Sequence, residues 1–181
     1  MDRKLELKDI AGNFPYGLCV KHYEDENYTI QKITGLDDDC ITFNNARESY
    51  FNEYEDDPIV IPILRPFSDL YKTIIHNGKN IIPILELAKM RIKNLKWRLK
   101  RIGVQDAPYY CAKAKLKNTT IEFYFYNGVF DIIRRNDDCV VTVDYQYELF
   151  DYLNELKIDY RGLIDAGLAV SVYDLEVNPY K

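Results

Sequence analysis

Hydrophobic and polar positions alternate in two separate stretches of the chain, and each stretch predicts a group of short strands. The first group comprises residues 17–23, 28–35 and 40–44, separated by acidic turns. The second comprises residues 109–116, 119–126, 129–134 and 139–144, separated by turn residues such as Asn127-Gly128. Alternation with a period of two between tight turns is typical of antiparallel strands. We therefore expect an N-terminal antiparallel meander and a C-terminal antiparallel sheet of about four strands.

A helical pattern fills the region between the two strand groups. At about 100° per residue, one arc of residues 84–102 collects the apolar side chains Ile84, Ala88, Ile92, Leu95, Leu99 and Ile102. Pro83 suits the first turn of this helix and Gly103 its end. Residues after Pro66 predict a shorter helix that runs toward His76. Asn77-Gly78 also fits a tight hairpin, but we favour a turn between two helices because Pro83 follows it.

The other segments predict smaller elements. Residues 4–11 suit a short helix, residues 59–64 an edge strand or an irregular run because of Pro62, and residues 45–57 a loop or a short helix. Residues 145–156 have helical spacing and should pack on the second sheet. The end of the chain predicts a helical turn capped at Gly167, and a tail at Val170–Tyr173 that can add to a sheet edge.

Strands segregated from helices indicate the α+β class. A length of 181 residues indicates a single domain, residues 1–181. Its expected sub-regions are the N-terminal strands in 1–65, the helices in 66–103, and the sheet with its packed helix in 104–181.

Composition supports a folded, water-soluble chain, because 47% of its residues are hydrophobic and 29% are charged. No apolar run approaches the roughly 18 residues of a membrane span, so no membrane association is expected. The four cysteines are isolated, and the first twelve residues lack the apolar core of a signal peptide. We expect a cytoplasmic protein with reduced thiols.

The net charge of −5 is unevenly distributed, and this uneven distribution gives the first candidate site. Residues 86–101 contain seven Lys or Arg and one acid, whereas residues 24–57 are strongly acidic. On the predicted helix, cations flank the single tryptophan; the candidate interaction residues are Lys93, Lys96, Trp97, Lys100 and Arg101. Three interpretations stay open. Trp97 is covered by the N-terminal region while the cations face the acidic segment, or Trp97 is a protein-binding hot spot, or the segment binds nucleic acid.

The second candidate site is the tyrosine face of the C-terminal sheet. Alternation in residues 121–126 places Ile121, Phe123 and Phe125 on one face, and Glu122, Tyr124 and Tyr126 on the other. Tyrosine suits partly buried sheet faces and interfaces. A helix of the same chain covers Tyr124 and Tyr126, or these residues receive a partner.

No constellation of residues indicates catalysis, a cofactor or a metal. Cys19 and His22 have half of a zinc-site spacing, but an alternating strand places them on opposite faces and no second ligand pair exists. Neither phosphate-binding glycine motif occurs. We therefore assign no catalytic, cofactor-binding or metal-ligating residue.

Three short stretches resemble a known group of proteins. They are Phe14-Pro15-Tyr16-Gly17-Leu18, Leu64–Leu70 (LRPFSDL) and residues 162–170 (GLIDAGLAV). The chain resembles small proteins encoded by phages and prophages of gut Bacteroidales bacteria, which have LPYGLK, ILRPLSDL and GLIDKGLAIDIN motifs. Cys19 and Phe67 depart from that pattern. The resemblance implies a gene carried by a mobile element and the cytoplasm of a bacterial host, and it implies no activity.

The sequence therefore favours a non-enzymatic protein-interaction module that contacts an unidentified protein through Trp97, Tyr124 and Tyr126. The alternative is an accessory nucleic-acid-binding protein that uses the basic segment 86–101. The oligomeric state is not indicated.

Overall fold

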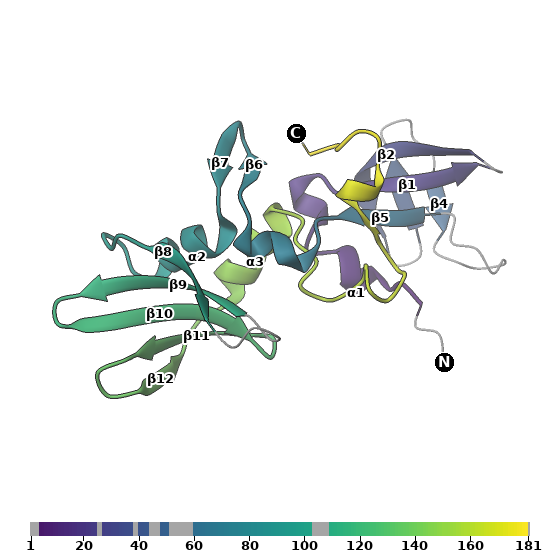
Figure 1. Cartoon of the computed structure of the whole chain (residues 1–181). Helices are drawn as coiled ribbons and strands as arrows, with labels where there is room; N and C mark the ends of the chain where they lie inside the picture. The colour runs from purple at the N-terminus through teal and green to yellow at the C-terminus, as the bar shows by residue number, and fades with distance from the viewer. Residues whose placement is uncertain are drawn as a thin grey trace. The chain divides into compact units, whose positions relative to one another are not determined.

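The structure is a computed structural model of the chain, and it describes residues 4–24, 27–37, 40–43, 48–50, 60–102 and 109–180 (Figure 1). Within these ranges it contains three α-helices and three sheets, and all but one of the strand pairings are antiparallel. The fold is therefore α+β with β structure predominating. None of the helices in the same ranges is long and apolar enough to cross a membrane.

The chain divides into two compact units. The first unit comprises Met1–Phe67 and Leu153–Lys181, and the second comprises Ser68–Tyr152. The expectation of one domain over residues 1–181 stays a prediction.

The first unit is built on a six-stranded sheet with the order β13-β5-β1-β2-β3-β4. Its strands are β1 (Cys19–Glu24), β2 (Asn27–Leu36), β3 (Cys40–Phe43), β4 (Glu48–Tyr50), β5 (Val60–Leu64) and β13 (Val170–Ser171). Strands β1, β2 and β3 pair antiparallel in sequence order, which confirms the predicted N-terminal meander. Of residues 45–57, only β4 lies within the described residues; there the prediction of a loop or a short helix was wrong, because Glu48–Tyr50 pair with β3.

The extended segment predicted at residues 59–64 is present as β5, but its predicted edge position was wrong, because β5 pairs with β1 on one side and with β13 on the other. Proline lacks the N–H that a second neighbouring strand would need. The parallel pairing with β13 begins after Pro62, at Ile63 and Leu64. The C-terminal tail thus adds to a sheet edge of its own chain over Val170–Ser171, and then turns into the 3-10 helix η3 (Val172–Asp174).

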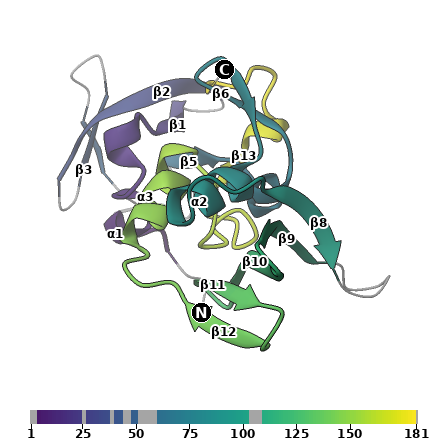
Figure 2. The same cartoon turned by 90° about the vertical axis from the view of Figure 1, so that its left-hand side faces the viewer.

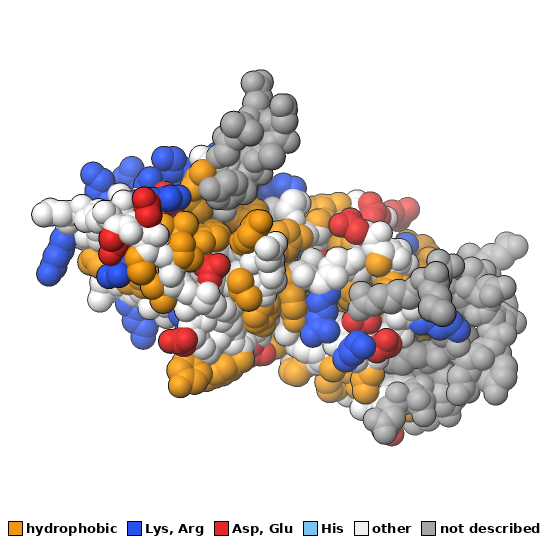
Figure 3. All heavy atoms as spheres, turned by 90° about the horizontal axis from the view of Figure 1, so that it is seen from below, with side chains coloured by type: hydrophobic (Ala, Val, Ile, Leu, Met, Phe, Trp, Pro, Cys, Tyr) orange, Lys and Arg blue, Asp and Glu red, His pale blue; other side chains and the backbone are white. Residues whose placement is uncertain are grey.

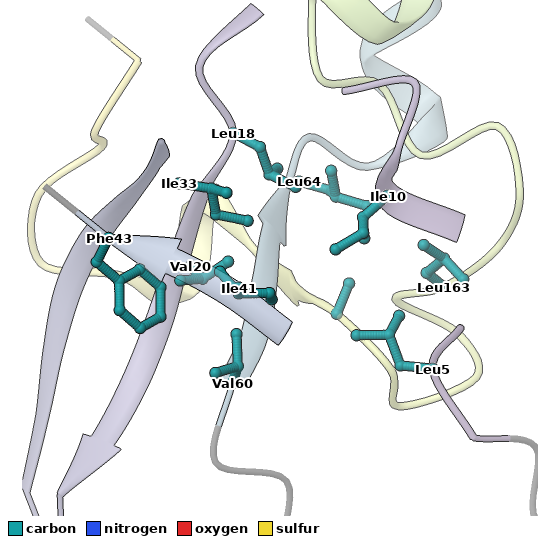
Figure 4. Close-up of a cluster of buried hydrophobic side chains, with 11 residues drawn as sticks. Leu5, Ile10, Leu18, Val20, Ile33, Ile41, Phe43, Val60, Leu64 and Leu163 are labelled. Carbon is teal, nitrogen blue, oxygen red and sulfur yellow. The ribbon is translucent and has the colours of Figure 1, made fainter. Parts of the chain in front are cut away.

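The core of the first unit lies against one face of this sheet, where β1, β2, β3 and β5 contribute buried aliphatic side chains (Figure 4). The short helix α1 (Leu7–Ile10) and the 3-10 helix η1 (Phe14–Tyr16) precede the sheet. The ring of His22 lies 4.9 Å from that of Phe43 in this core, whereas Cys19 belongs to a separate buried cluster with Ile63 and Val172. Cys19 and His22 therefore lie on opposite faces of β1, as the alternation predicts.

The second unit is built on a five-stranded antiparallel meander with the order β12-β11-β10-β9-β8. Its strands are β8 (Arg98–Ile102), β9 (Tyr109–Leu116), β10 (Thr119–Tyr126), β11 (Val129–Arg134) and β12 (Cys139–Thr142). The helices are α2 (Pro83–Arg91) and α3 (Tyr147–Glu155). The last residues of α3, from Leu153 onward, belong to the first unit. The four strands expected from the turn pattern and the following helix are confirmed.

The predicted helix toward His76 was wrong. After the 3-10 helix η2 (Phe67–Tyr71), the chain forms a hairpin of β6 (Ile74–His76) and β7 (Lys79–Ile81). Asn77 and Gly78 both have positive φ, +49° and +72°. Two such residues form the tight turn that matches strand twist, so the turn chemistry outweighs the apolar spacing.

The predicted helix over residues 84–102 was also wrong beyond Arg91. Pro83 starts α2 as expected, but Ile92 is already extended and Asn94 has a φ of +66°. Figure 2 shows the chain leaving α2 and continuing as the extended strand β8. Arg98 to Ile102 pair one by one with Lys113 to Tyr109 of β9. The sequence Arg-Leu-Lys-Arg-Ile fits the spacing of a helix as well as that of a strand, and pairing with β9 makes it a strand.

Candidate functional site

Alternation on β10 gives the second sheet two different faces. Phe123 is fully buried, and its ring stacks at 5.4 Å on that of Phe130. Phe150 of α3 contacts Phe125 and Phe130 on this side, and Figure 1 shows α2 and α3 on the same side of the sheet. We call the opposite face, which carries Glu122, Tyr124 and Tyr126, the outer face.

No helix of the second unit covers the outer face within the described residues. Tyr124 is half-buried, and Tyr126 is 63% exposed. Of the two possibilities left open by the sequence, covering of Tyr126 by a helix of the same chain is wrong, because this side chain is largely exposed. Glu122 lies on this face, as alternation predicts, and it is buried.

Strand register brings cations to the outer face beside the tyrosines. Residues that lie opposite one another in antiparallel strands share a face. The register places Arg98, Lys113, Glu122, Ile133 and Val140 in one row across the sheet from β8 to β12. The row changes from basic at β8 to apolar at β12. Figure 3 shows Lys and Arg side chains gathered at the left-hand end, in the part that β8–β12 form, with hydrophobic side chains beside them.

Glu122 is held by two cations. Its Oε1 accepts a hydrogen bond from Lys113 Nζ at 3.1 Å, and its Oε2 accepts one from Arg135 Nε at 2.8 Å. Burial acts to raise the pKa of Glu122, but the hydrogen bonds from Arg135 and Lys113 outweigh it and hold that pKa below its ordinary value. The carboxylate therefore stays charged at neutral pH, and it fixes the positions of both cations.

Two hollows adjoin this ion-pair cluster. The tyrosine pocket has a volume of about 350 Å³; its lining residues are Ile102, Cys111, Glu122, Tyr124, Phe125, Tyr126, Ile133 and Arg135. The cationic groove has a volume of about 580 Å³; its lining residues are Asn94, Leu95, Lys96, Arg98, Lys113, Ala114 and Lys115. Lys113 lines the groove and Glu122 lines the pocket, so their ion pair lies between the two hollows.

The cationic groove contains four cations and no acidic side chain among its lining residues. Lys113 is bound to Glu122, whereas Lys96, Arg98 and Lys115 form no ion pair with any residue in the described ranges. Like charges held close together repel each other, and an anion bound between them offsets this repulsion by its attraction to each cation. The groove is therefore suited to an anionic ligand.

The predicted interaction residues do not all lie at one site. Lys96 lines the cationic groove, while Lys100, Tyr124 and Tyr126 lie on the outer face. Lys93 is exposed in the turn after α2, outside the sheet. Arg101 lies opposite Tyr110, on the other face of β8 and β9 from Lys100.

Trp97 is buried at 7% exposure, and its Nε1–H donates to the carbonyl of Ile92 at 3.2 Å. An exposed tryptophan between cations was therefore wrong, and with it Trp97 as a direct binding residue. Whether the cations face the acidic segment 24–57 stays a prediction, because much of that segment lies outside the described residues.

Sequence reasoning missed Arg98, Lys113, Lys115, Glu122 and Arg135 as members of this site. The signal for two of them was present in Ala112-Lys113-Ala114-Lys115, where small and cationic residues alternate along β9. Arg135 is a turn residue after β11 and is placed by the hydrogen bond of its backbone N–H to Thr120 O, 3.0 Å.

Thiol chemistry at the pocket is disfavoured. Burial, helped by the negative charge of Glu122, raises the pKa of Cys111 to about 11, so the thiol is protonated at neutral pH. Within the described residues, no group of three or more His, Cys, Asp or Glu side chains has the arrangement of a metal site.

Lys157 is a buried cation of the first unit, with an exposure of 2%. Its Nζ donates to the carbonyls of Tyr16 at 2.8 Å and Glu155 at 3.0 Å, and lies 5.5 Å from the ring of Tyr180. Burial lowers the pKa of Lys157 to about 8. Because the ammonium hydrogens are directed at backbone carbonyls near the end of α3, the residue is a structural cap.

Comparisons with known proteins found no matching family model, no matching curated protein and no matching solved structure. The resemblance to Bacteroidales phage and prophage proteins therefore stays a prediction. The outer face of the second sheet must be interpreted from its own chemistry.

Proposed function

We propose that the protein binds single-stranded nucleic acid on the outer face of β8–β12. The observation that supports this most is the cationic groove, whose four cations adjoin a pocket lined by tyrosine rings. Cations neutralise phosphates, and aromatic rings stack on unpaired bases; proteins that bind single strands combine these two features.

A sheet face suits a single strand better than a duplex. Unpaired bases expose their faces to side chains that stand on the strands, as in other sheet-based single-strand binders. Tyr124 and Tyr126 are two residues apart on β10, so both side chains stand on the same face. The overall charge of −5 argues against non-specific coating of nucleic acid, and therefore a local site is proposed.

The test is a titration of a 3′-labelled single-stranded oligonucleotide, followed by fluorescence anisotropy at low and moderate salt. The double variant Lys96→Glu with Lys100→Glu should abolish most of the binding, because both side chains lie at the groove or on the outer face. The matched control is Lys4→Glu with Lys79→Glu, which makes the same charge change at exposed positions outside this face. Absence of salt-sensitive binding, or equal loss in both variants, would refute the proposal.

A protein partner is the second candidate function, and the edge strand β12 favours it. Val140 is 55% exposed and Val141 47% exposed, and β12 itself contains no charged residue that would discourage pairing with another strand. In a pull-down from host lysate, Val141→Lys should lose a specific partner that the control Val177→Lys, at a residue 69% exposed in the first unit, retains. Equal recovery with both variants would count against β12.

A further inference from the structure

We infer that the cationic groove holds a terminal phosphate of the bound strand, with the base of that nucleotide in the tyrosine pocket. This inference rests on the proposed binding of single-stranded nucleic acid, and it names the part of the strand that the site recognises. Its basis is the concentration of charge in one hollow.

The positive charge of the groove exceeds the negative charge of one internal phosphate. A phosphodiester carries a single negative charge, whereas a phosphate monoester carries about −1.5 to −2 at neutral pH. Lys96, Arg98 and Lys115 line the same hollow without an acidic partner in the described ranges, and Lys113 adds a fourth cation that is shared with Glu122. A strand that only crossed the sheet would be served by cations spaced along its path; the groove instead gathers them in one place.

The arrangement of the two hollows fits one nucleotide. The Lys113–Glu122 hydrogen bond of 3.1 Å lies between them, and so a phosphate in the groove is followed directly by the pocket. The walls of the pocket are mainly apolar and aromatic, with Ile102 and Ile133 beside the rings of Tyr124 and Tyr126. Its volume of about 350 Å³ is near the lower end of small-molecule pockets, about 300–1,000 Å³. It suits one base.

Glu122 positions the cations of this site. Because its carboxylate binds Lys113 on one oxygen and Arg135 on the other, it holds one cation at the groove and one at the pocket. The carboxylate of Glu122 is buried, with an exposure of 4%. Water and the incoming phosphate therefore do not displace it from the two cations. The anion therefore meets cations that are already placed.

The test compares three unlabelled oligonucleotides of one sequence, about 12 nucleotides long, as competitors against the labelled strand. They carry a 5′-phosphate, a 3′-phosphate, or hydroxyls at both ends. One phosphorylated strand should compete about tenfold more tightly than the hydroxyl strand, the gain expected from charged hydrogen bonds to the added group. The better of the two phosphorylated strands identifies the recognised end.

Two variants separate the groove from the pocket. Arg98→Gln with Lys115→Gln should remove the preference for the phosphorylated strand, because both residues line only the groove. Tyr126→Ala should weaken all three competitors by a similar factor and keep the preference, because a ring that stacks on a base does not contact the terminal phosphate.

Each result decides between the two claims. Equal competition by all three strands would overturn the inference while leaving the proposed function in place. Salt-insensitive binding, or no binding of any strand, would overturn both. A phosphate preference that survives Arg98→Gln with Lys115→Gln would also overturn the inference, because the preference would then arise outside the groove.

Discussion

The salt dependence of binding is the most quantitative consequence of the outer face. Binding to single strands weakens with salt by a slope of about −0.7 in log K against log salt for each phosphate neutralised. Lys96, Arg98 and Lys115 line the groove, and Lys100 stands on the same face of β8. We do not count Lys113, since Glu122 already binds it. A terminal phosphate of about two charges in the groove and one internal phosphate at Lys100 make about three charges neutralised, which predicts a slope of about −2.1.

This slope gives a measurable loss of affinity for the wild-type protein. Between about 50 and 200 mM monovalent salt, the association constant of a strand with that terminal phosphate should fall about 18-fold. The variant Arg98→Gln with Lys115→Gln leaves Lys96 and Lys100 to neutralise about two charges, so its slope should be about −1.4 and its loss about sevenfold over the same range. Both side chains are exposed, and therefore the variant should fold as the wild type does.

The assay is fluorescence anisotropy at four or more salt concentrations, with Lys4→Gln and Lys79→Gln as the control pair. The control should keep the wild-type slope, since both residues lie outside the groove. A slope unchanged in Arg98→Gln with Lys115→Gln would refute the assignment of phosphates to these residues. An equal change in the control would show that total charge, rather than the groove, governs binding.

Three further predictions concern stability. Trp97→Ala should lower the free energy of unfolding of the second unit by about 3–5 kcal/mol in urea denaturation, since Trp97 is buried; a loss below 1 kcal/mol would contradict its burial. Because burial lowers the pKa of Lys157 to about 8, unfolding takes up a proton between about pH 8 and 10.4, and wild-type stability should rise over this window relative to Lys157→Met. Parallel pH profiles for the two proteins would contradict it. Gly128→Ala should cost about 1 kcal/mol, seen as a lower melting temperature, because Gly128 has a φ of +79°; an unchanged midpoint would contradict it.

The elements that could be predicted from the sequence are those whose local signals agree. Strands β9 to β12 follow from alternation bounded by turn residues, and both Asn127 and Gly128 adopt the positive φ that such a turn needs. Helix α3 follows from the spacing of Leu149, Phe150 and Leu153. Here the local preference and the packing of the sheet favour the same structure.

The segment after α2 could not be predicted because two local patterns compete in it. Residues 92–102 keep helical spacing of apolar side chains, and residues 97–100 alternate as a strand does. Pairing with residues distant in the sequence decides between the two patterns. β9 offers an unpaired edge, and Arg98 to Ile102 form a fifth strand on it. A single sequence does not show which edge is open, so the long helix was the natural expectation.

The candidate site, too, could be predicted only in part from the sequence. Tyr124 and Tyr126 could be placed on one face from β10 alone, and the basic segment could be singled out from its charge. Their convergence could not be foreseen, because it depends on the β8–β9 register that brings Arg98 opposite Lys113. The face of Glu122 was predicted, but its burial could not be foreseen, because alternation gives the face of a side chain and not the cations that cover it.

Trp97 affects the proposed function through that register. A strand that slips by one residue moves every side chain to the opposite face, so a slip of β8 would exchange Arg98 and Lys100 for Leu99 and Arg101 on the outer face. The indole of Trp97 is buried directly before β8, and its hydrogen bond to Ile92 O ties it to the end of α2. Trp97 thus fixes which side chains of β8 lie on the outer face. Loss of nucleic-acid affinity in Trp97→Ala would therefore reflect displaced cations, and a base-stacking role would require an indole that is exposed.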